Sequence, residues 1–100
     1  MEWKPASIDA VKAIVREGLS RCSAAQAEAF QKFAMEPYVA PLLRYGNAET
    51  VVVVARKEFE VMYWEDVEEG FNISRLSSDG DVLDHFCNQD ELGMALEHWR

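Results

Sequence analysis

The chain has 100 residues, of which 49% are hydrophobic, and a formal net charge of -8. This length predicts a single domain, residues 1–100, that buries roughly two-thirds of the surface exposed by its unfolded chain. The negative charge argues against nucleic-acid and anionic membrane partners, because binding either one needs Lys and Arg to displace counterions. The longest apolar run, Val51–Ala55, is far too short to cross a bilayer. We therefore expect a soluble protein without nucleic-acid or membrane partners.

The two cysteines, Cys22 and Cys87, are too few for the disulfide framework of a small secreted domain. The first residues, MEWKPASIDA, also lack the basic and then apolar layout of a secretory signal. A reducing cytoplasm with both thiols free fits these observations best.

A first amphipathic helix is predicted over residues 7–18. Ser7 suits the N-cap position, and Gly18 is typical of a helix end. Apolar residues from Ile8 to Leu19 recur at spacings of three and four, which places them on one helix face. They are Ile8, Val11, Ile14, Val15 and Leu19.

A second helix is predicted over residues 23–35. Ser23 and Gln26 have the spacing of a capping box, in which each side chain bonds to the other residue's backbone N–H. Pro37 closes this helix because proline cannot continue the hydrogen-bond ladder. Residues 38–45, which contain Pro41, are interpreted as an extended link.

The period then changes to the alternation of β-strands, in a sheet between about residues 50 and 87. Lys57 and Glu58 are interpreted as the turn of a first hairpin, and Ser77–Gly80 as a later turn. The predicted strands are Val51–Arg56, Phe59–Trp64, Phe71–Ser74 and Val82–Phe86. Alternation places Phe59, Val61 and Tyr63 on the core side of the sheet.

A last helix is predicted over about residues 89–99, with Asn88 as its N-cap and Glu91 as the reciprocal partner. Its apolar stripe should dock on the sheet and consists of Leu92, Ala95, Leu96 and Trp99. The fold class is therefore α+β: a two-layer domain whose antiparallel four-stranded meander sheet packs against two N-terminal helices and one C-terminal helix.

The charge is distributed unevenly. Residues 1–50 hold six Lys or Arg and six Asp or Glu, whereas residues 51–100 hold four and twelve. The densest acidic run is Glu65, Asp66, Glu68 and Glu69, flanked by aromatic residues. Carboxylates steer a basic partner, and aromatic residues are enriched among binding hot spots.

The sequence therefore predicts a partner-binding site made of Trp64, Glu65, Asp66, Glu68 and Glu69. Tyr63 and Phe71 suit the core. Trp64 has the opposite parity to Tyr63, so it can either fill the core or anchor a partner.

No pattern predicts catalysis, a metal site or a cofactor. His85 and Cys87 share a strand face, but two ligands do not make a zinc site. Asp79, Asp81 and Asp84 lack the spacing of a calcium loop. An enzyme that uses His85 and the acidic run stays open as an alternative.

In size, layout and charge the chain resembles the small immunity proteins that neutralise bacterial toxins by masking a basic active site. The resemblance implies a non-catalytic inhibitor of a basic protein in a bacterial cytoplasm. A second alternative is an accessory or regulatory subunit that binds its partner through the same acidic surface.

Overall fold

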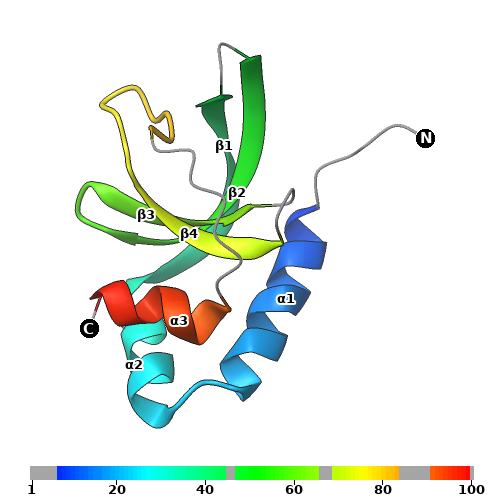
Figure 1. The fold of residues 1–100 in the computed structure, drawn as a ribbon, viewed down its shortest axis with the longest axis vertical. Coiled ribbons are helices and arrows are strands. Elements are labelled where there is room, and N and C mark those ends of the chain that lie inside the picture. The colour runs from blue at the N-terminus through cyan, green and yellow to red at the C-terminus, as the bar shows by residue number, and fades with distance from the viewer. Residues whose placement is uncertain (1–6, 45–46, 66–68, 84–90, 100) are drawn as a thin grey trace.

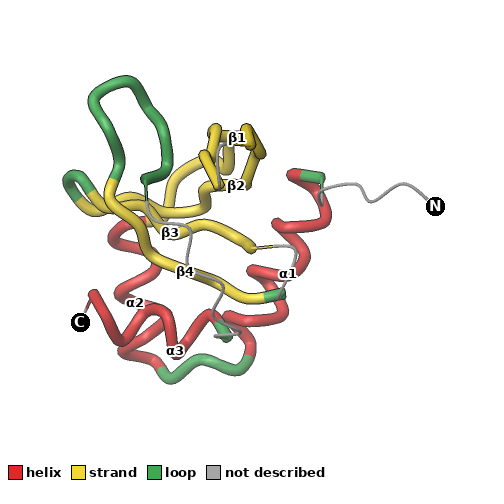
Figure 2. Tube along the Cα trace, turned by 45° about the horizontal axis from the view of Figure 1, so that its top comes forward, coloured by secondary structure: helices red, strands yellow, loops and turns green. Residues whose placement is uncertain are grey.

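The structure is a computed structural model that describes residues 7–44, 47–65, 69–83 and 91–99. Four strands form one antiparallel sheet in chain order. In order, the elements are helix α1 (Ile8–Ser20), helix α2 (Ala24–Phe33), strands β1 (Ala34–Arg44), β2 (Asn47–Lys57), β3 (Glu60–Glu65) and β4 (Gly70–Arg75), helix α3 (Leu92–Leu96) and a 3-10 turn (Glu97–Trp99). The three helices lie on one side of the sheet (Figures 1 and 2). The expected α+β meander, with two helices before the sheet and one after it, is confirmed.

The local signals for the first two helices work as expected. The Ser7 hydroxyl accepts a bond from the Ala10 N–H at 3.1 Å, and Ser23 and Gln26 form both bonds of a capping box. The first helix, however, does not end at Gly18 but continues to Ser20. Gly18 lies against Leu92 of α3, and a Cβ at this position would come within 2.9 Å of the Leu92 Cβ. The glycine therefore permits a close helix contact.

The segment expected to be an extended link is strand β1. It begins directly after α2 and pairs with β2, for example Ala40 with Val51 and Pro41 with Thr50. Pro41 is tolerated because β1 is an edge strand and its missing N–H would point away from β2. The outward direction is shown by the Pro41 carbonyl, which accepts a bond from the Val82 N–H at 2.8 Å.

The predicted fourth strand, Val82–Phe86, is not a strand in its described part. Val82 forms isolated bridges with Leu42 of β1 and with Leu76, just after β4. Residues 76–83 thereby connect the end of β4 to the free edge of β1. The remainder of that predicted strand, with His85 and Cys87, lies outside the described residues.

Both faces of the sheet bury apolar side chains. The face under the helices carries Val52, Val54, Met62, Trp64 and Phe71, which pack with Val11, Phe30, Leu92, Leu96 and Trp99. We call this cluster the helix-side core. The opposite face carries a second core, made of Ala40, Leu42, Val51, Val53, Val61, Tyr63 and Val82. Val61 and Tyr63 are therefore buried as predicted, but in the core that lies on the face away from the helices.

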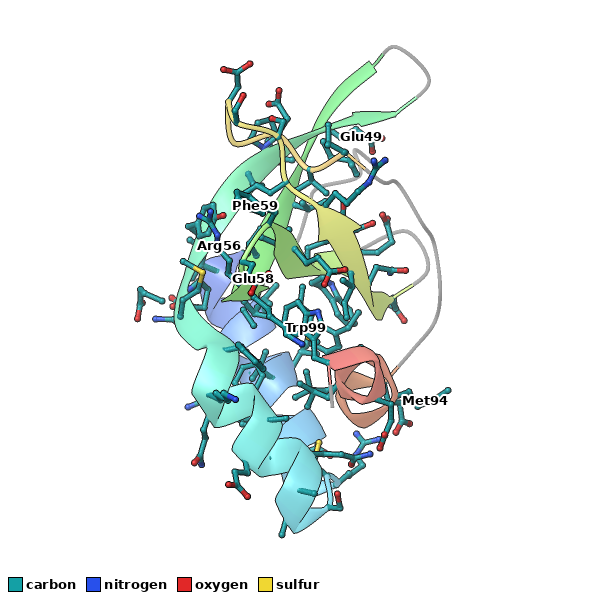
Figure 3. The ribbon with its side chains drawn as sticks, turned by 90° about the vertical axis from the view of Figure 1, so that its left-hand side faces the viewer. Glu49, Arg56, Glu58, Phe59, Met94 and Trp99 are labelled. Carbon is teal, nitrogen blue, oxygen red and sulfur yellow. The ribbon has the colours of Figure 1, made fainter. Side chains whose placement is uncertain are left out.

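The turn between β2 and β3 lies one residue later than predicted. Lys57 pairs with Glu60, so the turn residues are Glu58 and Phe59 instead of Lys57 and Glu58. Glu58 adopts the left-handed conformation, with φ 56°. Phe59 is 75% exposed at the hairpin tip (Figure 3), so its predicted place in the core is wrong.

The last helix is shorter than predicted. It begins at Leu92, with Glu91 at the N-cap position and no side-chain capping bond. Asn88, the predicted cap, lies outside the described residues. The predicted stripe is nevertheless buried as expected, since Leu92, Ala95, Leu96 and Trp99 each expose 4% or less.

Candidate protein-binding site

The structure places the predicted site residues in different surroundings. Trp64 is 9% exposed and packs edge-to-face on Phe71, with ring centroids 5.0 Å apart. Glu65 is 2% exposed, whereas Glu69 is exposed. Of the two alternatives for Trp64, the structure shows that it fills the core, and the Glu65 side chain beside it is also buried. Asp66 and Glu68 lie outside the part of the chain that the structure describes.

A pocket of about 260 Å³ lies where α1, α3 and the β3–β4 pair meet. Four apolar side chains make its floor, and four charged side chains stand around it. The floor consists of Ile14, Trp64, Phe71 and Leu92, and the charged rim consists of Glu17, Arg21, Glu69 and Glu91. We call this the acidic-rimmed pocket. It unites two of the predicted site residues, Trp64 and Glu69, with residues from both ends of the chain.

Sheet pairing fixes the floor of the pocket. Trp64 of β3 stands directly opposite Phe71 of β4. Glu69 precedes β4 in the left-handed conformation, with φ 53°, and is the last acidic residue before the chain turns into the strand at Gly70. The pairing thus holds two aromatic rings side by side and places Glu69 at their edge.

Ion pairs organise the rest of the rim. Arg21 donates to Glu17 across 3.0 Å and to Glu91 across 3.5 Å, and these side chains are all more than half exposed. Such exposed pairs contribute little to stability, but they hold α1 and the start of α3 at the pocket mouth. The rim has three carboxylates and one guanidinium, so it carries an excess of negative charge.

The same charge acts on a neighbouring thiol. Cys22 is free and half-buried. Burial raises its pKa above the ordinary value of 9.0, and the Glu91 carboxylate adds to the increase. The thiol therefore stays protonated near neutral pH, which makes it a poor nucleophile.

The pocket offers an apolar floor and charged rim groups that can contact a ligand. Within the described ranges, no three His, Cys, Asp or Glu side chains converge as metal ligands. Because His85 and Cys87 lie outside those ranges, the enzyme alternative has no described geometry to support it.

Sequence reasoning missed one exposed aromatic residue, Phe59. It stands between two exposed carboxylate residues, Glu58 and Glu60, which is the combination that we looked for at Trp64. A two-residue turn over Glu58 and Phe59 would have revealed it. The sequence offered no Gly or Asn there to mark the turn, however.

Comparison with protein-family models, with curated proteins and with solved structures finds no match to this chain. None of the helices in the described ranges has the length and apolar content needed to span a membrane. The function is therefore argued from the chemistry of the pocket itself.

Proposed function

We propose that the protein is a non-catalytic binding domain for a basic protein in the cytoplasm, of the kind that immunity proteins represent. The observation that carries the proposal is the acidic-rimmed pocket, in which an apolar floor is surrounded by an excess of carboxylates. Glu69 joins this pocket to the acidic run that begins at Glu65, so the local charge continues along the chain.

The pocket suits the side chain of a lysine or arginine. Both residues carry an apolar stem and a charged head, and they bury the stem while the head stays at the polar edge. In this arrangement the stem contacts Ile14 and the edges of the two aromatic rings, and Glu69 and Glu91 receive the cation. A bacterial toxin with a basic active site presents such side chains, as does the basic surface of an enzyme that needs an accessory subunit.

Charge reversal tests the proposal. Proteins captured by the purified domain from an extract of its source cells are first identified, and the binding of a captured partner is then measured between roughly 0.05 and 0.5 M salt. Because rim charges act on the rate of encounter, Glu69→Lys should slow association and flatten its dependence on salt. Asp79→Lys is the matched control, since it makes the same charge change in a turn outside the pocket.

The floor is tested at Ile14. Trp64→Ala would remove a large core side chain and report on folding, whereas Ile14 is only half-buried. Ile14→Ala should speed dissociation of the partner with little change in association. A partner whose binding is indifferent to salt, to Glu69→Lys and to Ile14→Ala would contradict the proposal.

A further inference from the structure

Two lysines gather around one aromatic ring at the C-terminal end of α2. The Lys32 Nζ and the Lys57 Nζ each lie 5.4 Å from the centroid of the Phe33 ring. The ring attracts cations through its quadrupole. Neither lysine has a carboxylate partner among the described residues, although the chain contains 18 acidic residues. Two ammonium groups therefore share one aromatic ring on a protein whose net charge is -8.

A buried hydrogen-bond donor lies beside the lysines. Trp99 is 4% exposed and packs edge-to-face on Phe33, with ring centroids 5.5 Å apart and an interplanar angle of 64°. Its indole Nε1 is buried and has no acceptor among the described residues. Leaving such a donor unpaired is costly, because the group gives up its bond to water and gains none in return. Figure 3 shows Trp99 among the side chains between the helices and the sheet.

Lys32 and Trp99 line a hollow of about 310 Å³ between α2 and the C-terminal 3-10 turn. Its apolar lining comes from Ala25, Ala29 and the two aromatic rings, and its charged lining from Glu28 and Lys32. A volume of this size is at the lower end of small-molecule sites, which combine apolar walls with a few polar groups. Lys57 approaches from β2 through its contact with Phe33.

We propose that this hollow binds a carboxylate attached to a small apolar body, such as an aryl carboxylate. Two ammonium groups and one indole N–H offer donors only, which a carboxylate matches with its acceptor oxygens. Glu28 lies one helical turn before Lys32 on the same face of α2 and disfavours a second negative charge on the ligand. Because the indole Nε1 is buried, a ligand oxygen reaches it only after a neighbouring side chain shifts. The site is independent of the acidic-rimmed pocket and of its proposed partner.

Benzoate is the probe, and the indole N–H of Trp99 is the reporter. In ¹⁵N-labelled full-length protein, the Trp99 Nε1–H signal is identified by its loss in Trp99→Phe. Titration with benzoate should move this signal downfield and saturate in the millimolar range, because the N–H gains an acceptor. Benzamide keeps a carbonyl acceptor but lacks the negative charge that the lysines attract, so at the same concentration it should move the signal much less.

Lysine substitutions test the charge contribution. Lys32→Gln and Lys57→Gln should each weaken benzoate binding about threefold, the scale of one exposed charge contact. Lys12→Gln is the matched control, since Lys12 lies on α1 and pairs with Glu36 instead. The proposal is overturned if the Trp99 signal does not respond to benzoate, if benzamide moves it equally, or if the Lys32 and Lys57 variants bind as the parent does.

Discussion

The two faces of the sheet are covered in different ways. On one face, Val52, Met62 and Trp64 pack beneath three helices drawn from both ends of the chain. On the other, Val53, Val61 and Tyr63 pack without any described helix, against residues of β1 and the segment that follows β4. Successive residues of β2 and β3 thus serve opposite cores.

This difference shows how a small domain can bury apolar side chains on both faces of one short sheet. The helix-side core depends on elements that are distant in sequence, such as α1 and α3. The second core is closed by the segment that follows β4. Val82 in this segment forms one bridge with Leu42 of the edge strand β1 and another with Leu76, just after β4 on the opposite edge. Burial on both faces also explains why the strands are nearly continuous apolar runs, as in Val51–Ala55.

The largest effect should come from Trp99→Ala on the helix-side core. Removing a large buried aromatic side chain leaves a cavity, and the free energy of unfolding should fall by about 4 kcal/mol. Chemical denaturation measures this loss, and Trp99→Phe should retain most of the stability because it keeps the ring against Phe33. An unchanged midpoint in Trp99→Ala would mean that the final turn does not contribute to the core.

A somewhat smaller loss, about 3 kcal/mol, should follow Leu42→Ala in the second core. Its effect should also be distributed differently, since Leu42 lies where residues 76–83 meet β1. Hydrogen exchange should show faster opening of the Val82 amide than of amides in α1. Equal acceleration in both regions would show that the two cores open as one unit.

Gly18→Ala should cost about 2 kcal/mol, the scale of overpacking, although alanine is the better helix former. The added Cβ would lie 2.9 Å from the Leu92 Cβ, which is too close, so α1 or α3 would have to shift. The substitution Ala13→Gly on the exposed side of α1 is a control for helix propensity alone. A stabilised Gly18→Ala variant would contradict the close contact between α1 and α3.

The smallest predicted effect is on the reactivity of Cys22. The pKa of Cys22 is raised in the folded state, so the folded state binds the thiol proton more tightly than the unfolded state. Proton binding at Cys22 therefore contributes to folding stability below pH 9.0. The contribution is lost as the pH rises through the folded-state pKa. In a Cys87→Ser background, alkylation of Cys22 at pH 8 should be slower than in the unfolded chain. Glu91→Gln should recover part of the rate, and no recovery would leave burial as the sole cause.

The helices were predictable because their signals are local. Ser7, Ser23 and Gln26 act on neighbouring backbone groups, so their roles follow from spacing alone. The end of α1 was not predictable, because Gly18 does not end the helix but leaves room for Leu92. Leu92 is distant in the sequence, so this contact could not be foreseen.

The strands were harder because their limits depend on partners. Pro41 argued against a strand until its place on the sheet edge was known. Alternation identified the two faces of β3 but could not say which one the helices cover, because both are buried. The position of Trp64 was ambiguous for this reason. Phe59 was predicted to be buried because the turn was placed one residue too early.

The contact between Gly18 and Leu92 also affects the order in which the two cores can form while the chain is being synthesised. As the chain leaves the ribosome, α1 and α2 emerge before the sheet, and residues 92–99, which complete their shared core, emerge after it. Until then the helix-side core lacks Leu92, Leu96 and Trp99, and the apolar surface that they cover is exposed. Such surfaces attract chaperones and other unfolded chains. The second core needs no residue beyond Val82 among those described, so it can form while synthesis continues. The strands of the meander can therefore pair before residues 92–99 are synthesised, and α1 and α2 complete their packing on the sheet only afterwards.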